Sequence, residues 1–129
     1  MKKYILLLLL LISSITYSQT RIGYSRKAIK AEFDGYKMKS GINANGVPYL
    51  EVTLVGITAV YGFDDNAVCM SCVIIPHDNA NLNTLVQKYN RDYIIISPIE
   101  WMMYSSGGIL RIQMKMVDSG GAYFLWTRY

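Results

Sequence analysis

The sequence predicts an α+β domain in which an antiparallel sheet of about six to seven strands carries two helices packed on one face. Three observations support this class. Strand-like segments outnumber helical ones, the links between strands are short, and two segments repeat apolar residues at helical spacing. Short links favour antiparallel neighbours, and helices on one face bury both apolar surfaces. The expected order is helix, three strands, helix, four strands.

The N-terminus has the layout of a secretory signal peptide. Lys2 and Lys3 precede an unbroken run of eight Ile and Leu residues, and small polar residues follow as far as Ser18. The run is shorter than the about 20 residues that a helix needs to span a bilayer. We therefore expect residues 1–18 to be cleaved and residues 19–129 to form one exported domain, periplasmic or extracellular, without stable membrane insertion.

Cleavage would leave 111 residues and a nearly neutral chain. The full sequence has 13 basic and 9 acidic side chains, and removal of Lys2 and Lys3 lowers the net charge from +4 to +2. This length suits a single core, and the small charge gives no reason to expect a nucleic-acid partner. Six basic residues fall within residues 21–40. Arg26, Lys27 and Lys30 among them are an alternative contact for an anionic partner, although a solvated helix face explains them more simply.

The first helix is expected to begin at Ser25, whose hydroxyl can cap the first turn, and to stop near Gly35. Apolar residues within it repeat at intervals of four and three, which makes one stripe: Ile29, Phe33 and Tyr36. Residues 40–46 are rich in Gly and Asn and predict a loop that ends in a turn.

Three strands are expected next, over residues 47–54, 57–63 and 68–75. Pro76 ends the third, because proline cannot donate to a sheet ladder. The second helix is expected to run from Asn79 or Asn81 to Tyr89, with Asp78 or Asn79 as its cap. Its apolar face is Leu82, Leu85, Val86 and Tyr89.

Four more strands are expected over residues 93–97, 99–104, 109–117 and 122–128. The third of them has the clearest alternation in the chain. It predicts that Leu110, Ile112, Met114 and Met116 are buried while Arg111, Gln113 and Lys115 face water. The two halves have a similar layout, but no repeat of individual residues supports an internal duplication.

The layout of residues 25–35, 47–75 and 81–89 resembles the type III secretion chaperone-like fold. It also resembles the tandem helix-plus-meander domains of exported β-lactamase-inhibitor proteins. The final pair of strands and the signal peptide depart from the secretion chaperones, which usually close with a helix and are cytoplasmic. The resemblance implies a protein partner, and it carries over no site residue.

Cys69, Cys72 and His77 are the residues most suggestive of chemistry. A C-x-x-C motif can be a redox pair, but such pairs usually stand where a helix begins, and here the surroundings are strand-like. Residues three apart in a regular strand face opposite sides, so we expect no disulfide. Turn composition explains His77 beside Asp78. We expect no catalytic residue, metal site or cofactor, and a periplasmic redox or metal-linked protein using these residues stays an alternative.

The aromatic content, with 11 Tyr, 2 Trp and 3 Phe, leaves the choice of ligand open. Exposed aromatics can bind proteins or sugar rings, while strand preference explains many of them. We expect a small, non-enzymatic, protein-binding domain whose partner surface is the sheet face opposite the helices. Its predicted contact residues are Arg111, Lys115, Tyr123 and Trp126. A sugar-binding module with exposed aromatics is the remaining alternative.

Overall fold

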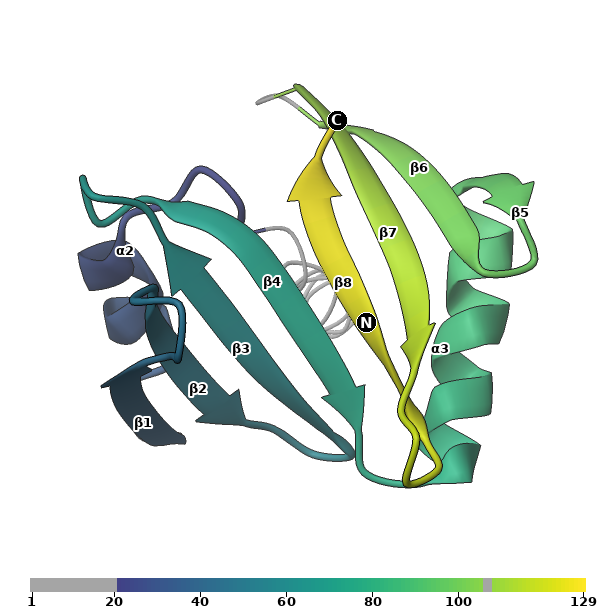
Figure 1. Ribbon diagram of the computed structural model, residues 1–129, viewed down its shortest axis with the longest axis horizontal. Helices are drawn as coiled ribbons and strands as arrows, with labels where there is room; N and C mark the ends of the chain where they lie inside the picture. The colour runs from purple at the N-terminus through teal and green to yellow at the C-terminus, as the bar shows by residue number, and fades with distance from the viewer. Residues whose placement is uncertain (1–20, 106–107) are drawn as a thin grey trace, which may run out of the picture.

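The computed structural model describes residues 21–105 and 108–129, so the predicted signal peptide lies outside the described residues. Figure 1 shows the two helices and the strands. The chain order of the elements is α2 (Arg26–Glu32), β1 (Lys37–Ile42), β2 (Pro48–Thr53), β3 (Ile57–Phe63), β4 (Cys69–Pro76), α3 (Asn79–Asp92), β5 (Ile94–Ser97), β6 (Glu100–Ser105), β7 (Gly108–Met116) and β8 (Ala122–Arg128).

All eight strands belong to one antiparallel sheet with the order β1-β2-β3-β4-β8-β7-β6-β5. The α+β class and the antiparallel sheet are confirmed. The predicted count of six to seven strands and the predicted order are wrong, because a strand precedes the three expected in the first half. Each half is therefore one helix followed by a four-stranded meander, and the last strands of the halves, β4 and β8, join them.

The missed strand is β1, whose sequence gives little periodic signal. It lies at the sheet edge, and it buries little, since Met38 is half-buried while Lys37, Lys39 and Ile42 are exposed. Pairing with β2 defines it, from Lys37 opposite Thr53 to Ile42 opposite Pro48. The predicted loop over residues 40–46 therefore contains the end of a strand as well as a turn.

One core lies between the helices and the face of the sheet that they cover. Ile29 and Phe33 enter it from the region of α2, and Leu85 and Tyr89 enter it from α3. Tyr89 meets Trp101, Phe124 and Trp126 edge-on, with ring centroids 4.9–5.6 Å apart. The Trp101 indole also donates to Oδ1 of Asn90 at 2.8 Å, which ties β6 to α3. Edge-to-face pairs are a favourable packing of aromatic rings.

Both helices begin at a capping residue that the sequence offered. The Ser25 hydroxyl accepts a hydrogen bond from the amide of Ala28 at 3.1 Å, and Oδ1 of Asp78 accepts one from the amide of Asn81 at 2.8 Å. The predicted cap at Ser25 is confirmed, and Asp78 rather than Asn79 caps α3. The first helix ends at Glu32, earlier than expected, and α3 continues to Asp92, beyond the expected Tyr89.

The two halves are joined by a short pairing between β4 and β8. Residues 71–74 of β4 pair with residues 124–127 of β8, four pairs in all. The segment before α2 adds to one end of this junction, because Cys69 exchanges backbone hydrogen bonds with Gly23 and Tyr24 at 2.7 and 2.8 Å. Among the described residues, neither helix is long and apolar enough to cross a membrane.

Candidate functional site

The sheet face that points away from the helices, here called the open face, carries the half-buried residues of β7 and β8. Buried and half-buried residues alternate along both strands. Leu110, Ile112, Phe124 and Trp126 therefore point into the core. The residues that point the other way are Arg111, Gln113, Lys115, Tyr123, Leu125 and Thr127.

An apolar row crosses the centre of the open face. The register aligns Val60 of β3 with Val73 of β4, and Val73 with Leu125 of β8. Polar residues flank this row, with Glu51 beside Val60 and Gln113 beside Leu125. All five are half-buried although no helix covers them, because each side chain shields its neighbours. An apolar centre with a polar surround is the usual composition of a protein interface.

Arg111 is held in a fixed position at one end of this face. Its Nε and Nη2 donate to Oε1 of Glu100 at 2.8 and 2.7 Å, and Nε2 of Gln113 approaches the same oxygen at 3.4 Å. Its guanidinium carbon lies 5.8 Å from the centroid of the Tyr129 ring. The Glu100 side chain is only 16% exposed, so the ion pair is partly shielded from water. Arg111 is thus oriented before any partner arrives.

Three exposed side chains lie on the same face near this arginine. Tyr104 pairs with Ile109 in the register, and the Tyr129 amide donates to the Ile109 carbonyl at 3.0 Å, so the three are neighbours. Their exposed fractions are 67%, 38% and 63% for Tyr104, Ile109 and Tyr129. We call these three residues and Arg111 the tyrosine patch. Sequence reasoning missed Tyr104 and Ile109 as contact residues. Ile109 is two residues from Arg111 on the same face of β7, whereas Tyr104 comes near them only through the pairing of β6 with β7.

Three of the four predicted contact residues lie on the open face. Arg111, Lys115 and Tyr123 are half-buried there, and Lys115 stands opposite Tyr123 in the register. The prediction for Trp126 is wrong, because its side chain is completely buried against Tyr89. Tyr123 and Trp126 are three residues apart in a regular strand and must face opposite sides.

The prediction that Met116 is buried beneath the helices is also wrong. Leu110 and Ile112 are buried and Met114 is half-buried, as the alternation indicates, but Met116 is 73% exposed. Met116 is the last residue of β7, where the strand runs into the hairpin that leads to β8. The alternation therefore predicts which face of the sheet a residue belongs to. It does not predict how far along the strand the helices cover that face.

Both cysteines face the core, so the prediction that they face opposite sides is wrong. Ser71 pairs with Gly62 but Cys69 pairs with Phe63, so Met70 is the extra residue of a β-bulge. Both thiols are free and completely buried, and burial raises the pKa of Cys69 to about 11 and the pKa of Cys72 well above its ordinary value. Protonated, inaccessible thiols are poor nucleophiles, so their surroundings do not favour the redox alternative.

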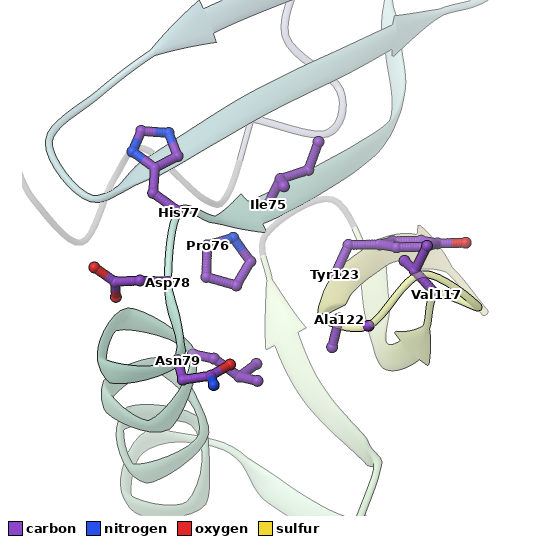
Figure 2. Close-up of a pocket in the computed structure, with 11 residues that line it drawn as sticks. Ile75, Pro76, His77, Asp78, Asn79, Val117, Ala122 and Tyr123 are labelled. Carbon is purple, nitrogen blue, oxygen red and sulfur yellow. The ribbon is translucent and has the colours of Figure 1, made fainter.

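His77 and Asp78 are both engaged in structural contacts. The His77 ring bonds through Nε2 to Oγ1 of Thr58 at 2.8 Å, while Asp78 caps α3 and also accepts from Nδ2 of Asn81 at 2.8 Å. In Figure 2 the His77 and Asp78 side chains point away from the hairpin that carries Ala122 and Tyr123. Within residues 21–105 and 108–129, no group of three or more His, Cys, Asp or Glu could hold a metal ion.

A pocket of about 360 Å³ lies between the β4–α3 turn and the β7–β8 hairpin. Its apolar lining comes from Ile75, Pro76 and Leu82 of β4 and α3, and from Val117, Ala122 and Tyr123 of the hairpin. Polar lining comes from the turn itself, His77 to Asn79, and the hairpin glycines complete the wall. Two of the lining residues, Ile75 and Tyr123, belong to the open face, so the pocket adjoins that face.

The two tryptophans are not available as the platform of a sugar-binding module. Trp101 and Trp126, the broadest rings, are completely buried. Of the open-face tyrosines, Tyr49 and Tyr123 fall in two separate rows of the register, while Tyr104 and Tyr129 lie on either side of Ile109. The Tyr49 side chain also lies against Gly41, where an added Cβ would stand 2.5 Å from the tyrosine hydroxyl.

The basic segment at residues 21–40 is divided between inner and outer positions. Arg21 is buried and forms an ion pair with Glu32, and the guanidinium of Arg26 lies 5.8 Å from the centroid of the Phe63 ring. Lys27 and Lys30 are exposed on α2. Two of the six cations are therefore engaged with core residues or with a carboxylate, which reduces the charge available on this surface.

No protein-family model, curated protein or solved structure matches this chain.

Proposed function

We propose that this protein is a small, exported, non-enzymatic domain that binds another protein through the open face of its sheet. The single observation that carries the proposal is the tyrosine patch, in which two well-exposed tyrosines and an isoleucine lie near an arginine held by Glu100. Action after export rests on the signal-like pattern of residues 1–18.

The composition of this patch suits a protein partner. Tyr and Arg are over-represented among the residues that dominate binding energy at protein interfaces, and orientation in advance reduces the entropy lost on binding. The patch continues into the apolar row of Val60, Val73 and Leu125, which lies on the same face. A partner that covered both would bury apolar area at the centre and polar groups around it.

The test replaces both tyrosines of the patch with serine, as Tyr104→Ser/Tyr129→Ser, in the mature chain. Affinity capture from an extract of the native source, quantified by mass spectrometry, should lose its specific partner by about tenfold or more, since truncation of a dominant contact typically costs at least about 2 kcal/mol. Both side chains are more than 60% exposed, so thermal stability should change little.

The matched control is Tyr36→Ser, which removes a tyrosine of similar exposure, 52%, that packs against Phe33 beside α2. Partner recovery should be unchanged in this variant. Equal recovery with the double variant and with wild type would contradict the proposal and leave the exposed lysines of α2 as the next surface to vary.

A further inference from the structure

Different segments of the chain hydrogen-bond to successive parts of the β4 edge that faces the second half of the molecule. Cys69 bonds to Gly23 and Tyr24 of this chain, and residues 71–74 pair with β8. The pairing with β8 ends at Ile74 and Phe124, although β4 continues to pair with β3 through Pro76. Beyond that point the two halves of the sheet separate, and the 360 Å³ pocket lies in the space between them.

The backbone at this end of β4 is poorly suited to receive another strand. Pro76 has no amide hydrogen, and the His77 amide already donates to the carbonyl of Gly56 at 2.9 Å. At the opposite end of the same edge, the backbone of Cys69 both donates and accepts hydrogen bonds, and the segment that contains Gly23 and Tyr24 pairs with it there. The open end therefore suits a side chain better than a strand, because strand addition depends on backbone hydrogen bonds.

The apolar part of the pocket wall suits a flat apolar side chain, and the turn of His77, Asp78 and Asn79 supplies a polar part. Ile75, Pro76, Leu82, Val117 and Ala122 supply an apolar lining, and Figure 2 shows the Pro76 and Tyr123 rings on opposite sides of the space. Concave apolar sites with a few polar groups at the margin are typical of sites that bury an anchor residue.

The charge of Lys115 near the pocket indicates which partner residue would stand next to the aromatic anchor. Lys115 stands directly opposite Tyr123 in the register, and no ion pair involves it among residues 21–105 and 108–129. A carboxylate beside the anchor would therefore meet a cation that has no other partner in the described structure. Complementary charges at an interface margin guide the approach of a partner.

We propose that this pocket receives an aromatic side chain of the partner protein, next to an acidic residue that meets Lys115. This inference rests on the proposed protein-binding function and identifies a second contact, distant from the tyrosine patch. The shared residues Ile75 and Tyr123 connect the pocket to the open face, so one partner can engage both.

The pocket is tested without the partner by a titration of the isotope-labelled mature chain with N-acetyl-tryptophanamide, followed by NMR. We expect saturable shifts of the Gly120, Gly121 and Ala122 amides and the Leu82 methyl groups, with a Kd on the order of 1 mM for so small a probe. N-acetyl-alaninamide should give none. Absence of saturable shifts at these positions up to the solubility limit of the aromatic probe would overturn the proposal.

A variant that fills the pocket separates this inference from the proposed function. Val117→Phe places a larger side chain at a 43% exposed lining position, and Val55→Phe is its control at a fully exposed position outside the pocket. The first should abolish the probe shifts and weaken partner capture about tenfold, and the control should do neither. If Val117→Phe captures the partner normally while the tyrosine-patch variant loses it, the pocket proposal is overturned and the proposed function stands. If both capture normally, the proposed function fails and the probe titration alone decides whether the pocket binds aromatic groups.

Discussion

Several buried groups of this protein must stay uncharged to remain in the core. Burial raises the pKa of Cys69 to about 11 and raises the pKa of Cys72 well above its ordinary value. It also raises the pKa of Tyr61 and Tyr89, and that of Tyr93 to about 12. In each case the unfolded chain loses its proton at a lower pH than the folded chain does.

This difference predicts that alkaline pH destabilises the fold. A folded pKa above the unfolded value gives stability that is present below the unfolded pKa and lost as pH rises toward the folded pKa. For Cys69 that window runs from about pH 9, the pKa of an unperturbed thiol, to about 11, with a slope of about 1.4 kcal/mol per pH unit. Urea unfolding at intervals from pH 7 to 10.5 should show a nearly constant free energy of unfolding and then a fall above about pH 9.

Cys69→Ala is the control for this pH dependence. It removes one of the titrating groups, so its stability should be lower at pH 7 and should decline less steeply than that of wild type above pH 9. A wild-type stability that is constant from pH 8 to 10.5 would contradict the assignment of these thiols to the core.

Among the elements, α3 depends on the residue that begins it. Asp78 accepts hydrogen bonds from both the amide and the side chain of Asn81, and its negative charge lies at the positive end of the helix dipole. Replacement by alanine should cost about 0.5–2 kcal/mol of unfolding free energy. Asp78→Ser should retain most of the stability, because serine also caps helices well.

Chemical denaturation of wild type, Asp78→Ala and Asp78→Ser measures this ranking. Equal losses for alanine and serine would show that the cap hydrogen bond is not the source of the effect. If the negative charge of Asp78 contributes separately from its hydrogen bond, the stability of Asp78→Ser should lie between that of wild type and that of Asp78→Ala.

On the scale of the whole molecule, two similar halves share one core. The cluster of buried residues includes Ile29 and Leu50 from the first half and Leu110 and Trp126 from the second. Four backbone pairs between β4 and β8, together with this cluster, connect the halves. We therefore expect the halves to unfold together, as small single domains usually do.

Ile29→Ala tests this cooperativity, because Ile29 is completely buried in the first half while both tryptophans lie in the second. The substitution should cost about 2–5 kcal/mol and should shift the transitions seen by tryptophan fluorescence and by far-UV circular dichroism equally. Lys27→Ala, on the exposed side of the same helix, should shift neither. A fluorescence midpoint unchanged by Ile29→Ala would show that the second half unfolds independently.

Local patterns in the sequence determined the class of the fold and the identity of most elements. Alternation in residues 109–116 correctly separates Leu110 and Ile112 from Arg111 and Lys115, since side chains in a strand alternate whatever lies around them. Ser25 correctly predicts the start of α2 for an equally local reason, because an N-cap needs only its own hydroxyl and an amide of the first turn.

Tertiary structure alone decided the features that depend on residues far apart in the chain. The edge strand β1 exists because β2 pairs with it, and the bulge at Met70 exists because Phe63 pairs with Cys69. The burial of Trp126 follows from the position of Tyr89 on α3, and the pocket follows from the separation of β4 from β8. Each of these depends on long-range pairing or packing, and such contacts override a weak local signal.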